Sequence, residues 1–303
     1  MKVALASLFF LFIGWTSIAQ EKLQLSEYDF PEKTIGVSER QYDFQNYNKS
    51  WKAGRTVNYK FNKGNLIYQR TAYGLGGGTD SYELSYNDKN QMVHRIHFRT
   101  GSKTDGKYEY DYVYTGTNPV TITEAATHSR SYAPKTVISY NAKGEKSQED
   151  SYNGNDKLTA RTSYFPDQTI QVVYDGDRLW QKRVTKLKKG KTEEYTVFDK
   201  NDQVISQETF KYKKGNLISK TTLKKDGSTN TRPYTYKMIN GFEVARIEIY
   251  EGYDKKPRIE GFITEYILED DQKIGVTTGK ETATLDELLT DAKKQYGLKN
   301  FDE

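Results

Sequence analysis

One short segment carries the side chains best suited to bind a ligand. The residues at every second position of segment 107–114 are Tyr108, Tyr110, Tyr112 and Tyr114. This period places them on one face of a β-strand. Aromatic planes along a strand can stack on sugar rings while hydroxyls bond the sugar, and a protein partner could use the same groups. The alternative is that the rings form the buried core face of a sheet, and both interpretations stay open.

Metal and thiol chemistry find little support in the sequence. The chain contains no cysteine and three histidines, which excludes thiolate metal sites, a disulfide framework and a lipid-modified N-terminal cysteine. His94 and His97 are three residues apart and should lie on opposite faces of a strand. His128 follows in a loop-like stretch, and no acidic turn has the EF-hand spacing. We therefore expect no metal site and no cofactor.

Signatures of catalysis are also missing. No Gly-x-Ser-x-Gly motif is present, and no triad can be inferred from residue order. Carboxylate pairs such as Asp175 with Asp177, or Glu269 with Asp270, could support glycoside hydrolysis at a suitable separation. Both pairs fall in turns, where aspartate serves local hydrogen bonding. We predict a chain without catalytic residues, and an enzyme acting on polysaccharide or peptidoglycan remains the alternative.

Repeated hairpins are the elements that must position these residues. A pattern of an aromatic residue, a polar turn with Gly or Asn and, in most copies, an aliphatic residue recurs at Phe61–Leu66, Tyr86–Met92, Tyr140–Gly144, Tyr152–Leu158, Tyr174–Leu179, Phe198–Val204, Tyr212–Leu217 and Tyr236–Phe242. Apolar and polar residues alternate between the turns, which predicts strands. The sequence therefore predicts a mainly β fold, an extended antiparallel sheet of repeated hairpins that is twisted, wrapped or partly closed. We assign it to residues 59–283, after a lead-in with one or two strands in residues 20–58.

The two ends of the chain differ from the repeats. Residues 1–19 have a basic start at Lys2, an apolar run and small residues before Gln20, which predicts a cleavable secretory signal. Residues 284–303 form a predicted C-terminal helix and tail, with Thr284 and Glu287 as a capping box and an amphipathic helix from Thr284 to Tyr296. Signal removal would leave no membrane span and a periplasmic or secreted protein that is not a lipoprotein.

Charge and composition limit the partners. The 303-residue chain has 46 basic and 41 acidic residues, a formal net charge of +5. The basic run Lys186–Lys191 sits at a predicted hairpin tip and contains no aromatic residue, so we expect no nucleic-acid binding. Aromatic residues reach 14% with 25 tyrosines. Their rings supply the apolar area that a sheet core needs.

Part of the repeat resembles a known family. The segments Tyr174–Leu179, Phe198–Val204 and Tyr212–Leu217 resemble the bacterial YD repeats of the RHS type, and the likeness covers about residues 59–245. The resemblance implies a long antiparallel sheet that twists, wraps or closes. It implies no catalytic residues, because that repeat has none. Some shorter secreted proteins of this type are assigned to carbohydrate binding or surface interaction.

These observations favour an exported, non-catalytic repeat protein. We expect it to be a binding or structural module of the cell envelope or extracellular space, with a glycan or an envelope protein as its partner. A polysaccharide- or peptidoglycan-acting enzyme is one alternative. An immunity or antitoxin-like partner protein is another.

Overall fold

The computed structural model describes residues 30–74, 77–101, 105–126, 134–213, 216–251 and 257–296. The predicted signal, His128 and the residues after Tyr296 lie outside these ranges.

Almost all described secondary structure is β. The strands are β1 (Thr34–Gln45), β2 (Ser50–Asn62), β3 (Asn65–Ala72), β4 (Thr79–Tyr86), β5 (Met92–Thr100), β6 (Gly106–Thr115), β7 (Val120–Ala126), β8 (Lys135–Tyr140), β9 (Lys146–Tyr152), β10 (Leu158–Tyr164), β11 (Gln168–Asp175), β12 (Arg178–Lys188), β13 (Lys191–Asp199), β14 (Val204–Lys213), β15 (Asn216–Lys224), β16 (Thr229–Ile239), β17 (Phe242–Glu251), β18 (Pro257–Leu268) and β19 (Lys273–Ile274). One helix, α1 (Glu281–Tyr296), follows them.

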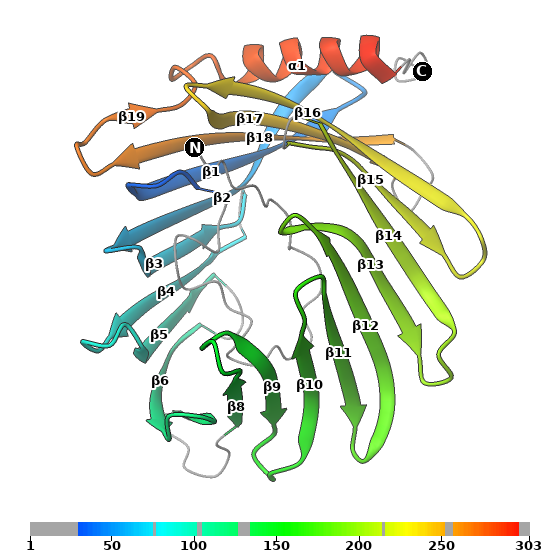
Figure 1. The fold of residues 1–303 in the computed structure, drawn as a ribbon. Coiled ribbons are helices and arrows are strands. Elements are labelled where there is room, and N and C mark those ends of the chain that lie inside the picture. Colours follow the sequence, from blue (N-terminus) through cyan, green and yellow to red (C-terminus); the bar gives the residue numbers. More distant parts are fainter. Residues whose placement is uncertain are drawn as a thin grey trace.

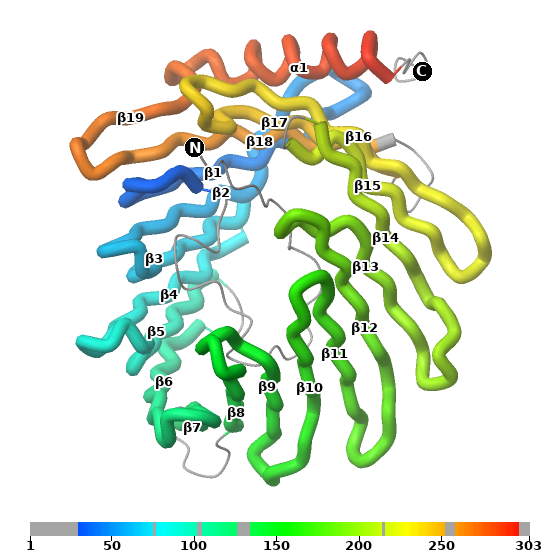
Figure 2. The backbone as a smooth tube through the Cα atoms, in the orientation of Figure 1, coloured from blue at the N-terminus to red at the C-terminus, as the bar shows by residue number. Residues whose placement is uncertain are grey.

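The sheet closes into a barrel of 18 antiparallel strands. Each strand pairs with its sequence neighbours, and β1 pairs with β18 in a regular register from Gly36↔Ile267 to Asp43↔Glu260. The short β19 continues the wall beside the end of β18, where Ile274 pairs with Tyr266. Figures 1 and 2 show the ring. The predicted antiparallel hairpin array is confirmed, and its sheet is closed.

Two kinds of hairpin turn explain the repeated aromatic-and-turn motif. In the first, the Asn141 side chain accepts hydrogen bonds from the backbone amides of Lys143 and Glu145 at 2.9 and 3.0 Å. Gly144 takes a positive φ of 76° to complete the turn. Asn87, Asn153 and Asp199 accept the same pair of backbone bonds. The motif is therefore the local chemistry of an Asx turn.

The second kind is a two-residue turn in which one or both central residues have positive φ. Between Asp175 and Arg178, only Gly176 does, with a φ of 62°. Lys189 and Gly190 have φ values of 53° and 75°, and Asn240 and Gly241 have values of 52° and 86°. Turns of this hand match the right-handed twist of the flanking strands. The basic run Lys186–Lys191 lies at such a tip, as expected.

The helix identifies the outer face of the wall. α1 lies over β16, β17 and β18, on the side away from the centre of the ring (Figure 1). Its Leu285 packs against Gly261, which pairs with Ile247. Cross-strand partners point to the same face of a sheet. Following the registers around the ring therefore assigns every paired residue to the inner or the outer face.

Two apolar clusters stabilise the barrel. The first lies mainly on the inner face, with Val57, Met92, Tyr112, Val244 and Tyr266 among its members. The second fills the space between α1 and the outer wall, where Leu285, Leu288, Leu289 and Ala292 meet isoleucines of β17 and β18.

The helix begins three residues earlier than the sequence predicts. It starts at Glu281, and the amide of Thr284 already donates to the carbonyl of Lys280 at 3.0 Å. Thr284 is buried within the first turns, so it is not the capping residue. Polar contacts add to the apolar packing: Trp51 Nε1 donates to Asp286 at 2.8 Å, and Lys237 pairs with Glu287 at 3.1 Å.

Candidate functional site

All four tyrosines of the predicted row lie on the inner face of β6. Tyr108 pairs with His97 and Tyr110 with Arg95. Tyr112 pairs with Glu124 and Tyr114 with Ile122. The alternation in the sequence thus assigned the row correctly to one face.

The row divides into a buried end and an exposed end. Tyr112 is only 4% exposed and belongs to the inner apolar cluster. Tyr114 donates to the carbonyl of Met92 at 2.8 Å, and burial raises the pKa of its phenol. The ring of Tyr110 lies beneath the Arg95 guanidinium, 4.6 Å from its centre. Tyr108, in contrast, is 42% exposed, so it is the member of the row best able to contact a ligand.

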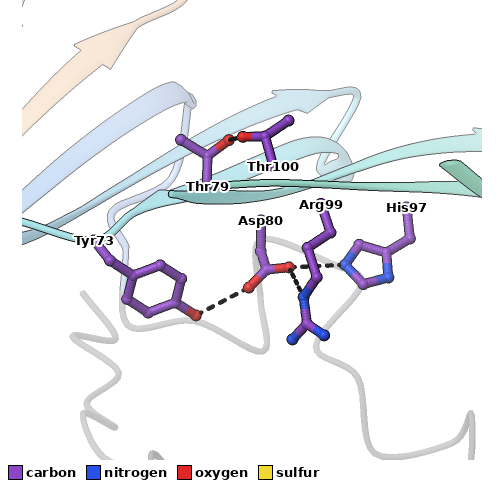
Figure 3. Close-up of polar contacts among 6 residues, drawn as sticks. All are labelled: Tyr73, Thr79, Asp80, His97, Arg99 and Thr100. Atoms are coloured by element: carbon purple, nitrogen blue, oxygen red, sulfur yellow. Dashed lines mark hydrogen bonds and ion pairs between the residues drawn. The ribbon is translucent and has the colours of Figure 1, made fainter. Parts of the chain in front are cut away.

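A polar network adjoins the exposed end of the row (Figure 3). Asp80 of β4 accepts a hydrogen bond from Tyr73 at 3.2 Å and one from Arg99 Nε at 3.2 Å. His97 Nε2 lies 3.0 Å from the same carboxylate. Cross-strand pairing of Asp80 with Arg99 and of Tyr82 with His97 brings the groups together. We call Tyr73, Asp80, His97 and Arg99 the Asp80 network.

The network keeps Asp80 ionised. Burial alone would raise the pKa of Asp80, but hydrogen bonds from His97 and Tyr73 and the charge of Arg99 outweigh it and hold the pKa below its usual value. The pKa of Tyr73 shifts the other way, since burial and the Asp80 charge disfavour its phenolate. At neutral pH Asp80 is therefore a fixed acceptor and Tyr73 a fixed donor.

Two tyrosines hold the His97 ring. Tyr82 stacks on it at 4.4 Å between ring centres with an interplanar angle of 15°. Tyr108 approaches it at 5.8 Å and 35°. The imidazole therefore lies between two tyrosine rings and is oriented by its contact with Asp80.

The network does not have the arrangement of a nucleophilic catalyst. A serine or threonine nucleophile needs an adjacent base such as His97. The flanking hydroxyls of Thr79 and Thr100 instead bond each other at 2.7 Å on the opposite side of the strands (Figure 3). Within the described ranges, no three His, Cys, Asp or Glu side chains are grouped as metal ligands. What the site offers is an aromatic surface beside fixed charges.

The charged residues of β5 do not all lie on the outer face. Arg95 and Arg99 point inward with the tyrosines. The register shift opposite Met92 breaks the alternation at the start of β5, so Met92 and His94 lie on different faces. The prediction for the histidines is confirmed: His97 points inward, and His94 contacts Asp111 at 2.7 Å on the outer face.

The other candidate groups do not form a site. Asp175, Asp177, Glu269 and Asp270 are exposed at turns. A hollow of about 590 Å³ lies along α1 beside Asp286, and one of about 430 Å³ lies at the barrel end near Phe30; neither contains the tyrosine row. On the inner wall of β17, Arg246 binds Glu243 at 2.8 Å and Glu248 at 3.0 Å. The charges of that cluster pair with one another within the wall.

Comparison with known proteins gives little further guidance. No protein-family model and no curated protein sequence matches the chain. Among solved structures, the chain is similar to a porin-like protein from Bacteroides uniformis, with 10% identity over 77% of this chain and 96% of that chain and a TM-score of 0.42. Among the described residues, α1 included, no helix combines the length and the apolar character of a membrane span.

The resemblance to YD repeats is wrong. No family model matches residues 59–245 or any other part of the chain. The motifs that carried the resemblance are an Asx turn at Asp199 and two-residue hairpins closed by the pairs Asp175↔Arg178 and Lys213↔Asn216. Such turns occur wherever short antiparallel strands are joined.

Proposed function

We propose that the protein is an exported, non-catalytic binding protein of the cell envelope, and that it binds carbohydrate on the inner wall of the barrel around Tyr108. The observation that carries the proposal is that Tyr108 is 42% exposed beside an ordered network of charged groups. Exposed aromatic rings fixed by their neighbours are efficient binding surfaces because little conformational entropy is lost when they are covered.

The network supports binding because its geometry is set before a ligand arrives. Asp80 already holds Tyr73, His97 and Arg99 at 3.0 to 3.2 Å. Stacking on Tyr82 fixes the His97 ring, and the Tyr108 ring contacts the other side of this imidazole at a tilt. A sugar could cover the Tyr108 ring and exchange hydrogen bonds with the polar groups beside it.

The outer wall supports a location in water. Charged residues point outward on strands all around the ring, as at Lys60, Arg70, Glu83, Asp111, Lys135, Arg161, Lys186 and Lys211. A barrel in a bilayer carries an apolar outer band, and a basic residue at the bilayer midplane costs about 2–4 kcal/mol. Together with the predicted signal in residues 1–19, this wall favours the periplasm or the extracellular space.

The location can be tested by fractionation. The protein should leave the cell with its predicted signal and appear in the periplasmic or culture fraction without detergent. Retention in the outer membrane after carbonate washing would overturn the proposed location and place the wall in lipid.

Ligand binding can be tested with a matched pair of tyrosine variants. The protein would be screened on a glycan array, and any glycan that binds would be titrated against Tyr108→Ala and Tyr68→Ala. Tyr68 is on the neighbouring wall at β3 but points outward, where it pairs with Glu83. Binding should be lost with Tyr108→Ala and kept with Tyr68→Ala. An array without binding, or equal affinity in both variants, would refute the proposal.

A further inference from the structure

We infer that the saccharide bound at Tyr108 is acidic, a sugar carrying a carboxylate or sulfate group that Arg99 recognises. This inference rests on the proposed function and specifies its ligand. It depends on three features of the wall: the position of the Tyr108 ring, the free end of Arg99 and the role of Asp80.

A glycine brings the ring and the guanidinium together. The Tyr108 ring folds back over Gly106, where an added Cβ would lie 3.2 Å from Cε2, Cζ and Oη of that ring. Gly106 is the cross-strand partner of Arg99. The ring therefore occupies the space directly across from Arg99, and one small ligand can contact both.

Arg99 presents the unused part of its guanidinium to solvent. Its side chain is 47% exposed, and the bond to Asp80 uses only Nε, at 3.2 Å. Figure 3 shows the two terminal nitrogens pointing away from Asp80. A guanidinium held in this way offers a planar pair of donors that matches a carboxylate or sulfate.

Asp80 acts as a positioning residue for that pair. Its two oxygens already accept from three protein groups, so its charge is satisfied within the wall. Holding Nε sets the plane of the guanidinium. A lysine at position 99 would keep the positive charge and lose the planar fork.

Titration calorimetry with matched saccharides tests the inference. The exported protein would be titrated with trigalacturonate, with its carboxyl-reduced counterpart galactotriose, and with a sulfated galactan oligosaccharide. We expect at least one acidic saccharide to bind roughly 10-fold or more tightly than the neutral one at low salt, as a charge-assisted hydrogen bond provides. The two acidic probes distinguish a uronate ligand from a sulfated one.

Variants assign the effect to its residues. Arg99→Lys should remove most of the preference for the acidic saccharide, while the matched change Arg70→Lys on the outer face should leave it intact. Gly106→Ala should displace the Tyr108 ring and weaken acidic and neutral saccharides alike. Melting temperatures would show whether each variant is folded.

The outcomes separate this inference from the proposed function. Equal affinity for acidic and neutral saccharides would overturn the inference and leave carbohydrate binding in place. A preference that survives Arg99→Lys would overturn recognition by the planar guanidinium of Arg99, because a positive charge without the fork would then suffice. If no saccharide binds on the array or in solution, both proposals are refuted.

Discussion

The contact between Gly261 and Leu285 predicts a specific non-additivity in stability. Leu285 is 0% exposed, and a Cβ added at Gly261 would lie 2.7 and 2.8 Å from its two Cδ atoms and 3.0 Å from Cζ3 of Trp51. Such distances are too short for undistorted packing. The helix therefore rests on this part of the wall because residue 261 lacks a side chain.

The magnitudes follow from the two substitutions. Leu285→Ala should lower the free energy of unfolding by about 2–5 kcal/mol, since it leaves a cavity in a fully buried site. Gly261→Ala should lower it by about 1–3 kcal/mol through overpacking. In the double variant the new methyl group enters the space vacated by Leu285. The combined loss should therefore be smaller than the sum by about 1–2 kcal/mol.

Urea denaturation followed by tryptophan fluorescence and circular dichroism would measure the three variants. Trp51 reports directly, because it packs beside Leu285 and donates to Asp286 of α1. As a control, Gly261→Ala combined with Ile138→Ala, a buried residue of the separate inner cluster, should be additive. Additivity within about 0.5 kcal/mol for the Gly261 and Leu285 pair would refute this account of how α1 docks.

Three further predictions concern the polar groups. Burial raises the pKa of Glu243 to about 7 against the lowering effect of Arg246. Its native state thus holds a proton more tightly than the unfolded chain, and this stabilisation is complete below pH 4.5 and lost as the pH rises through 7. The free energy of unfolding should therefore fall by up to about 3 kcal/mol between pH 4.5 and 8. Denaturation at several pH values should show a smaller pH dependence of this free energy for Glu243→Gln. An unchanged pH dependence would contradict the assignment to Glu243. Asp80→Asn should lower the melting temperature and the free energy of unfolding, the latter by about 1–3 kcal/mol, because Arg99 and His97 lose a charged acceptor. The control is Asp111→Asn, which should cost less because the contact of Asp111 with His94 is more exposed. Asn141→Ala should lower the free energy of unfolding, measured by urea denaturation, by about 1 kcal/mol. Asn141→Asp should retain most of the stability, because the aspartate keeps the acceptor for the amides of Lys143 and Glu145. Equal losses in the two variants would show that this acceptor is unimportant.

The local architecture could be predicted from the sequence because its causes are local. Alternation within residues 107–114 determines which side chains share a face, and the Asx and glycine positions determine where hairpins turn. Closure could not be predicted in this way. The pairing of β1 with β18 joins residues at opposite ends of the chain, and no turn or spacing near Val37 indicates Tyr266 as its partner.

The candidate site was only partly predictable for a related reason. Tyr108 was identified from its strand, but Asp80, His97 and Arg99 were not connected with it. Their meeting depends on the registers of β4, β5 and β6, which a bulge beside Met92 shifts by one residue. Strict alternation of inner and outer residues starting from Met92 would therefore place Arg99 on the outer face, whereas it lies on the inner face.

Ring closure also limits when this chain can finish folding. The last full wall strand spans Pro257–Leu268, and its partner on the closing side begins at Thr34. Until a ribosome or an export channel has released residues near 268, the growing sheet has two unpaired edges that can capture other extended chains. Contacts this distant in sequence form slowly. A chain truncated before Pro257 would keep both edges permanently, so premature termination should yield aggregates rather than a smaller barrel.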